Sequence, residues 1–315
     1  MPILELSQSS ADPRSGRSCR RSVLVIQRAL AVCVLLFAGL AAPAPLQVQS
    51  QAQDRPTVNV DPGGIARWAA GDSVSCAMNG RSWAALEGVC YYPVDVQQSP
   101  DVLEIARWLD SSPIDLGWLV VNEKEFELQS IEFPDDDFVH LSPENLARLY
   151  EEQALIKPIF RRRGGPARFT LPLGQPLESP PEARYFGVRR EFNGEPKNPH
   201  TGIDYAIGVD NPVLAVADGT VVLTGEHFFA GTSVYLHHGD GLVSMYFHLN
   251  SIEVEEGAEV KRGDTIAKVG STGRSTGPHL HLGIRWRGAR VDPSLLLADP
   301  SALPTVAAAE GSGAE

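Results

Sequence analysis

Glycine-containing turns divide the region between residues 212 and 286 into short apolar segments. Turn-forming sequence occurs at residues 217–220, 238–241 and 269–273, and the segments between these turns are rich in Val, Leu, Ile and Tyr. This pattern is typical of antiparallel strands that are joined by hairpins. The sequence therefore predicts a mainly β fold, with an antiparallel β-sheet in this region.

The histidines of the chain gather in the same region. Seven of the eight lie within residues 200–281, and a solvated surface gives no reason for such clustering. His200 and Asp204 are four residues apart, and His279 and His281 are two apart in a strand-like segment, so both imidazoles point to one face. His248 lies in another strand-like segment, where it is expected to share one face with Tyr246. A catalytic zinc takes three ligands of these types and leaves a position for water, so the cluster predicts a metal site.

Several motifs follow one another in a fixed order between about residues 169 and 297. In this order they resemble the lysostaphin/LytM-type zinc metallopeptidases, the murein endopeptidases that cut peptide bonds in peptidoglycan. The motifs that carry the resemblance are Phe186-Gly-Val-Arg-Arg, His200-Thr-Gly-Ile-Asp, Pro212-Val-Leu-Ala-Val-Ala-Asp-Gly, Tyr246-Phe-His-Leu, Gly270-Ser-Thr-Gly and Gly277-Pro-His-Leu-His.

The resemblance implies a role for each residue of the cluster. His200, Asp204 and His281 are expected to bind one zinc ion, and His248 and His279 to handle protons and stabilise the transition state. We assign the proton transfer to His279 and oxyanion stabilisation to His248. The sequence is equally consistent with the two roles exchanged. All five residues are intact, which favours an active enzyme over a non-catalytic or latent LytM-type activator of a cell-wall amidase.

The expected substrate is a peptide cross-link of peptidoglycan. An exported chain with a small domain before the catalytic one resembles periplasmic enzymes that cut D-alanyl–diaminopimelate bonds, and cleavage of glycine bridges is the alternative. The chain is acidic, with a formal net charge of −12, and this excludes nucleic acid as an expected partner. The basic segments at residues 161–163 and 285–287 are interpreted as solvated surface in preference to local patches that capture the substrate.

Three further residues near the predicted site are expected to have supporting or structural roles. Tyr246 either adds a hydrogen bond at the site or lies in the β core. His238 is expected to orient a turn, because no zinc position remains for it, and His227 is expected to be a loop residue that lines the substrate groove. His140, the histidine outside the cluster, has no assigned function.

Residues 1–52 read as an export segment. Five arginines precede the apolar run at residues 29–42, which is too short for a typical membrane span but fits the apolar part of a signal peptide. We expect either cleavage after Ala44 or Ala52, or retention as an N-terminal anchor. Both outcomes predict an exported protein of the periplasm or cell envelope, free or anchored to the inner membrane.

The rest of the chain divides into two domains and a tail. Residues 53–160 are expected to form a small β-rich domain that could bind a regulatory partner of the envelope, and 161–298 the zinc peptidase domain. Residues 299–315, rich in Ala, Gly, Ser and Glu towards their end, are expected to be disordered.

Two local features are expected in the first of these domains. Cys76 and Cys90 are the only cysteines after the export segment, and in an exported chain they favour one disulfide over two free thiols. A helix is predicted near residues 142–155, with Ser142 as N-cap and Pro143 in the first turn, ending before Pro158.

Overall fold

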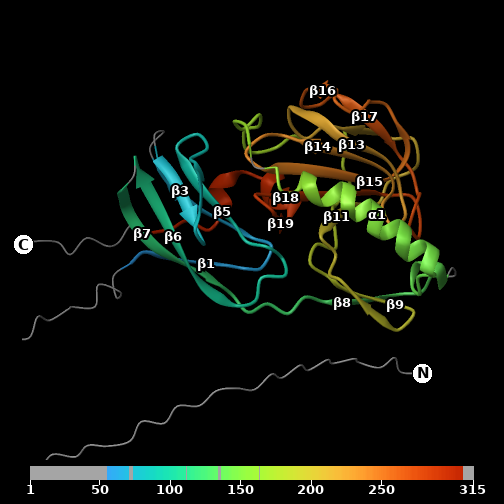
Figure 1. Ribbon diagram of the computed structural model, residues 1–315, viewed down its shortest axis with the longest axis horizontal. Helices are drawn as coiled ribbons and strands as arrows, with labels where there is room; N and C mark the ends of the chain where they lie inside the picture. Colours follow the sequence, from blue (N-terminus) through green and yellow to red (C-terminus); the bar gives the residue numbers. More distant parts are fainter. Residues whose placement is uncertain (1–54, 71–73, 111, 134–135, 163, 308–315) are drawn as a thin grey trace, which may run out of the picture. The chain divides into compact units, whose positions relative to one another are not determined.

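The large sheet of the structure is built from strands that the glycine-containing turns separate (Figure 1). The computed structural model describes residues 55–307 except 71–73, 111, 134–135 and 163, so the predicted export segment lies outside the described residues. The strands are β11 (Gly202–Tyr205), β12 (Pro212–Leu214), β13 (Gly219–His227), β14 (Gly231–His237), β15 (Leu242–Ile252), β16 (Glu259–Val260), β17 (Thr265–Val269), β18 (Leu280–Trp286) and β19 (Ala289–Val291).

All pairs in this nine-stranded sheet are antiparallel, which confirms the predicted mainly β fold. The main order is β11-β18-β15-β14-β13-β16, with β12 and β17 paired beside it and β19 on β18. Alternate residues of β18 face the core, because Leu280, Leu282, Ile284 and Trp286 are all fully buried in one apolar cluster. This alternation leaves His281 on the opposite face of the sheet.

A β-bulge in β15 determines where His248 points. Val234 of β14 pairs with Tyr246, but Thr232 pairs with Leu249, so two residues of β15 lie opposite one of β14. His248 has a φ of 62°, in the left-handed region that a non-glycine residue rarely adopts. The expectation that Tyr246 and His248 share one face is therefore wrong, because the bulge turns His248 away from the face of Tyr246.

Tyr246 lies in the β core, the second of the two positions expected for it. Its side chain is fully buried in the apolar cluster of the large sheet. The backbone N–H of Val216 donates to its hydroxyl oxygen at 3.0 Å, and Ser244 Oγ lies 3.1 Å from the same oxygen. Tyr246 therefore supports the sheet from behind the site.

Two smaller sheets form the β-rich region that precedes the large sheet. Five strands pair in the order β1-β7-β6-β3-β4, and the other two, β2 and β5, pair with each other. A shared apolar core that includes Trp68, Ile105 and Leu119 lies between these sheets. The strands are β1 (Thr57–Val60), β2 (Ile65–Ala69), β3 (Val74–Met78), β4 (Arg81–Ala84), β5 (Val89–Pro93), β6 (Asp101–Leu109) and β7 (Ser112–Val121).

A disulfide joins the two smaller sheets. Cys76 of β3 and Cys90 of β5 are bonded, with a Cα–Cα distance of 5.4 Å, and both are fully buried. The predicted disulfide is therefore confirmed. Because its cysteines belong to different sheets, it holds the two layers of this β-rich region together.

Residues before and after the predicted domain boundary between 160 and 161 pair in the same small sheet and pack in the same apolar core. β8 (Leu128–Ile131) runs parallel to β9 (Arg189–Phe192), which pairs with β10 (Glu195–Lys197) in a three-stranded sheet. Ile65 and Tyr91 belong to the apolar cluster of the large sheet. The described residues accordingly belong to one compact unit.

Charged contacts add to this shared core, and they change the interpretation of residues 285–287. Arg287 pairs with Asp240 and donates to the carbonyl of Tyr91 at 2.7 Å, and its guanidinium lies 4.5 Å from the ring centroid of Trp83. The guanidinium of Arg285 lies 4.1 Å from the ring centroid of Phe160. Their interpretation as solvated surface is therefore wrong, because both side chains pack between elements.

Helix α1 (Pro143–Ile159) follows a short 3-10 turn, η1 (Asp136–Phe138). Ser142 caps it by accepting from the N–H of Asn145, as predicted, but the helix continues through Pro158 instead of ending before it. Ile159 is buried against Tyr235 and Val243 of the large sheet, and this packing holds the last turn despite the proline. No helix within the described part of the chain has the length and apolar character required to cross a membrane.

The segment after the large sheet is ordered up to residue 307. It contains α2 (Pro293–Leu297) and the 3-10 turn η2 (Pro300–Ala302), and the N–H of Val306 donates to the carbonyl of Arg67 at 2.9 Å. Leu303 and Val306 are buried. The expectation of a disordered tail from residue 299 is therefore wrong for residues 299–307, because two apolar side chains dock into the cores. Residues 308–315 lie outside the described part.

Candidate metal centre and catalytic site

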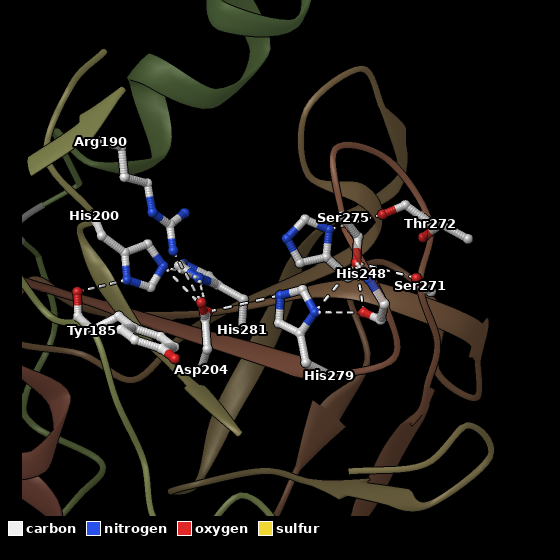
Figure 2. A network of polar contacts seen from close by, with 11 residues as sticks. Tyr185, Arg190, His200, Asp204, His248, Ser271, Thr272, Ser275, His279 and His281 are labelled. Carbon is white, nitrogen blue, oxygen red and sulfur yellow. Dashed lines mark hydrogen bonds and ion pairs between the residues drawn. The ribbon is translucent and has the colours of Figure 1, made fainter. Parts of the chain in front are cut away.

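Three of the predicted residues converge on one point at the edge between β11 and β18 (Figure 2). Asp204 of β11 pairs directly with His281 of β18, and His200 lies just before β11. His281 Nδ1 lies 2.9 Å from Asp204 Oδ1 and 2.9 Å from His200 Nε2, and His200 Nε2 lies 3.2 Å from Asp204 Oδ1. These atoms form the one candidate metal cluster found among the described residues.

The donor set fits a zinc ion. Two imidazole nitrogens and one carboxylate oxygen are a catalytic zinc combination, and ligand atoms bonded at about 2.0–2.1 Å in a tetrahedron lie about 3.3 Å apart. The three separations of 2.9–3.2 Å are close to this spacing. With the His200 proton on Nδ1, its Nε2 and Asp204 Oδ1 face each other as two lone pairs 3.2 Å apart, an arrangement that a bound cation would stabilise.

Surrounding groups orient each of the three ligand candidates. His200 Nδ1–H donates to the carbonyl of Tyr185 at 2.9 Å, which leaves Nε2 without a proton and facing the cluster. Arg190 donates to Asp204 Oδ2 at 3.1 Å, so only Oδ1 faces the histidines. The ring of Phe247 stacks on His281 with centroids 5.2 Å apart.

Gly202 provides the space that His281 needs. A Cβ at this position would lie 2.5 Å from His281 Nε2, which is closer than real Cβ atoms come. The glycine of the His200-Thr-Gly-Ile-Asp motif therefore allows the β11 backbone to pass beside the imidazole. Motif recognition alone could not supply this reason.

The protonation states favour metal binding. Burial opposes charge on Asp204, but the adjacent imidazoles of His200 and His281 hold the pKa of its carboxyl well below the usual range. Burial lowers the pKa of His281 to about 4, against the opposing hydrogen bond to Asp204. At neutral pH the carboxylate is therefore charged and this imidazole neutral, which are the forms that bind a metal ion.

His248 and His279 lie beside the cluster with their ring centroids 4.7 Å apart. His248 Nδ1–H donates to the carbonyl of Thr272 and His279 Nδ1–H to that of Gly277, both at 2.8 Å. Each neutral ring therefore keeps a free lone pair on Nε2. His279 Nε2 lies 3.9 Å from Asp204 Oδ1, next to the ligand candidates.

Burial, with further contributions from His279 and His281, lowers the pKa of His248 to about 3. His248 is thus neutral near pH 7, and its Nε2 is able to accept a hydrogen bond but not to donate one. The predicted role as oxyanion donor consequently requires that His248 first receive a proton.

Two cavities border these residues. The larger, of about 550 Å³, is lined by His200, His248 and His281 together with Leu149 and Ile156 of α1. The smaller, of about 420 Å³, is lined by Asp204 and His279. The side chains of the cluster are thus shared between two cavities.

The remaining histidines of the region serve the fold or the cavity wall. His238 is fully buried, with Nδ1 2.8 Å from the carbonyl of Asp218 and Nε2 2.7 Å from Ser244 Oγ, as expected for a residue that orients a turn. His227 lines the larger cavity, although it ends β13 instead of lying in a loop.

Sequence reasoning missed Arg190 and Arg274. Arg190 lies in the motif Phe186-Gly-Val-Arg-Arg, so a signal was present, but only the fold places its guanidinium on Asp204. Arg274 lies between the motifs Gly270-Ser-Thr-Gly and Gly277-Pro-His-Leu-His and lines the larger cavity. No spacing rule predicts that either side chain reaches the site.

Comparison with known proteins agrees with this geometry. The chain is 44% identical over 94 residues to peptidoglycan DD-endopeptidase ShyA of Vibrio cholerae, which covers 30% of this chain and 22% of that protein. It is 46% identical over 94 residues to DD-carboxypeptidase/endopeptidase Mpg of Neisseria meningitidis serogroup B, with the same coverage of 30% and 22%. The chain thus spans about a fifth of the length of these curated relatives.

The fold as a whole is similar to a solved structure. A crystal structure from Pseudomonas aeruginosa, described as a peptidase M23, matches with a TM-score of 0.59 and 28% identity, over 75% of this chain and 94% of that one. Residues 198–293, which include all five predicted site residues, match peptidase family M23. The chain therefore carries a peptidase domain of family M23, and the resemblance inferred from its motifs is confirmed.

Proposed function

We propose that this protein is a zinc-dependent endopeptidase that hydrolyses peptide cross-links of peptidoglycan, at D-alanyl–diaminopimelate bonds. The observation that carries the proposal is the convergence of His200, Asp204 and His281 on one point, with the free Nε2 atoms of two further imidazoles beside it. Relatives named peptidoglycan DD-endopeptidase support the substrate class.

Each residue of the site has a defined task in this proposal. His200, Asp204 and His281 hold one zinc ion, which supplies a Lewis acid that lowers the pKa of a water molecule to about 7 and polarises the scissile carbonyl. Arg190 keeps Asp204 oriented and charged through its contact with Oδ2.

His279 is placed to act as the general base. Its Nδ1–H is fixed on the carbonyl of Gly277, so Nε2 takes the proton of the attacking water and then delivers it to the leaving amine. His248, neutral in the resting site, takes a proton from solvent through the larger cavity as charge develops on the reacting oxygen, donates a hydrogen bond to that oxygen, and returns the proton to solvent when the product leaves. Burial makes that proton unfavourable at rest, and negative charge on the reacting oxygen offsets this cost.

We further propose that the protein works outside the cytoplasmic membrane. The basic residues before the apolar run at 29–42 support export, and the disulfide between Cys76 and Cys90 fits an oxidising compartment. The β-rich region that contains this disulfide is the proposed contact for a regulatory partner of the envelope.

Digestion of intact sacculi by the purified protein tests the function. We expect loss of cross-linked dimeric muropeptides, measured by mass spectrometry, with new ends that identify the D-alanyl–diaminopimelate bond. A chelator should abolish the reaction and added zinc should restore it. Unchanged muropeptides from folded protein that contains one zinc ion per chain would contradict catalysis and favour an amidase activator.

A further inference from the structure

The larger cavity has a strongly basic lining in an otherwise acidic protein. Among the described residues that line it, Glu152 is the only acidic one, and its carboxylate already accepts from the N–H of Phe228 and pairs with Arg148. The chain as a whole has a formal net charge of −12. The cations that line the cavity are Arg190, Lys197, Arg274, Arg285 and Arg290.

Four of these five cations have partners of their own. Arg190 pairs with Asp204, and Arg290 pairs with Asp95. Lys197 Nζ donates to the carbonyl of Val139 at 3.3 Å, and Arg285 donates to the carbonyl of Gly288 at 3.4 Å. These four side chains therefore already form ion pairs or hydrogen bonds within the protein.

Arg274 is different. Its guanidinium lies 4.1 Å from the ring centroid of Phe229 and 4.6 Å from that of Phe192, so its position is fixed by two aromatic side chains. No carboxylate or carbonyl among the described residues accepts a hydrogen bond from it. Burial, with the neighbouring charge of Arg190, lowers the pKa of Arg274 to about 10.

A partly buried cation without an anion is unfavourable, and the two cation–π contacts of Arg274 do not replace a carboxylate. The loop that carries Arg274 also supplies the carbonyl of Thr272 to His248 and that of Gly277 to His279. A ligand on Arg274 would therefore be held by the same loop that orients the two imidazoles.

We propose that Arg274 is the anchor for a free carboxylate of the substrate peptide in the larger cavity. The inference rests on the proposed function for its peptide substrate, because stem peptides of peptidoglycan carry free carboxylates. The planar guanidinium suits a carboxylate because it donates two parallel hydrogen bonds. Two sources present this chemistry, the terminal carboxylate of a D-alanine and the free side-chain carboxylate of diaminopimelate.

Three soluble cross-linked dimers test the proposal, one with all carboxylates free, one amidated at the terminal D-alanine and one amidated at diaminopimelate. The wild-type protein should cleave one amidated dimer about 10- to 100-fold less efficiently in kcat/KM than the free dimer, and that dimer identifies the carboxylate. Arg274→Gln should lower kcat/KM on the free dimer by a similar factor and no longer distinguish the two substrates.

Conservative and control variants separate charge, shape and folding. Arg274→Lys keeps the charge without the planar fork, so it should retain part of the discrimination. Arg161→Gln removes an equal charge from an exposed position outside the larger cavity and should behave like the wild type. If Arg274→Gln lost the same factor on all three dimers, Arg274 would only be holding Phe192 and Phe229, and the proposal would be overturned.

A binding measurement keeps this inference separate from the proposed catalysis. Calorimetric titration of the wild-type protein and Arg274→Gln with the same dimers, in the presence of a chelator, requires no turnover. If neither protein cleaved any dimer, the proposed function would fail, yet wild-type preference for a free carboxylate would still support the anchor. Equal affinities of the wild-type protein for free and amidated dimers would overturn it.

Discussion

His279 and His281 are separated by one residue but present different nitrogens to the site. His281 Nδ1 faces Asp204. His279 Nδ1–H instead donates a hydrogen bond to the carbonyl of Gly277, which leaves its Nε2 free. The difference follows from the backbone, because His281 lies within β18 and His279 just before it. Equal spacing in a strand therefore does not imply equal function.

This difference predicts opposite metal contents for two substitutions. His281→Ala should lose both the metal and activity, whereas His279→Ala should keep the metal and lose about 10²–10⁴-fold in turnover. Metal content by mass spectrometry, measured beside hydrolysis of a soluble dimer, distinguishes the two. The exposed His140 provides a control, because His140→Ala removes an imidazole outside the site. Full metal occupancy in His281→Ala would refute the ligand assignment.

The sequence was informative about the site residues because their types are chemically restricted. His200, Asp204, His248, His279 and His281 were all predicted, and the fold brings them together. The residues that orient them were not predictable, because Tyr185 and Thr272 act through backbone carbonyls that any residue could supply. Arginine side chains reach far, so their partners depend on the whole fold.

Strands and turns were predicted more reliably than their irregularities. Alternation along β15 assumes a regular strand, and the bulge at His248 breaks that assumption. The last turn of α1 continues past Pro158 because Ile159 packs on the large sheet. Both departures come from tertiary contacts, which local sequence patterns do not contain.

The link between β3 and β5 leads to a prediction for this element pair. The Cys76–Cys90 bond closes a loop with a sequence separation of 14, and a loop of about 15 residues corresponds to about 3 kcal/mol. The double variant Cys76→Ala with Cys90→Ala should therefore lower the free energy of unfolding by about 3 kcal/mol, measured by urea denaturation. A urea midpoint of the double variant equal to that of the wild type would contradict it.

At the scale of the whole molecule, the fold class was predictable and the sharing of the core was not. The apolar patterns indicated strands on both sides of residue 160, but no pattern indicated that Ile65 and Tyr91 pack with the large sheet. Contacts between residues more than a hundred positions apart leave no local periodicity in the sequence. The tail was misjudged for the same reason.

Buried histidines make the stability of the whole molecule depend on pH. Burial lowers the pKa of His238 to about 4, below the usual value near 6.5, so the folded state keeps this imidazole neutral. As pH falls from 6.5 towards 4, the unfolded chain binds a proton that the folded protein does not, and stability decreases.

The variant His238→Gln isolates this contribution. Between pH 6 and pH 5 its free energy of unfolding should fall less steeply than that of the wild type, by up to about 1.4 kcal/mol per pH unit. Urea denaturation of both proteins at several pH values measures the two slopes. Identical slopes for His238→Gln and wild type would show that the buried imidazole does not couple folding to pH.

The contact between Val306 and Arg67 has a practical consequence for anyone who wishes to study the catalytic region alone. The family match covers residues 198–293, but a fragment with these boundaries lacks Ile65, Tyr91 and Leu303, which complete its apolar interior. Such a fragment would expose a hydrophobic patch to water and is expected to aggregate. Peptide-bond chemistry in this protein therefore has to be measured on a chain that keeps both ends of the described region.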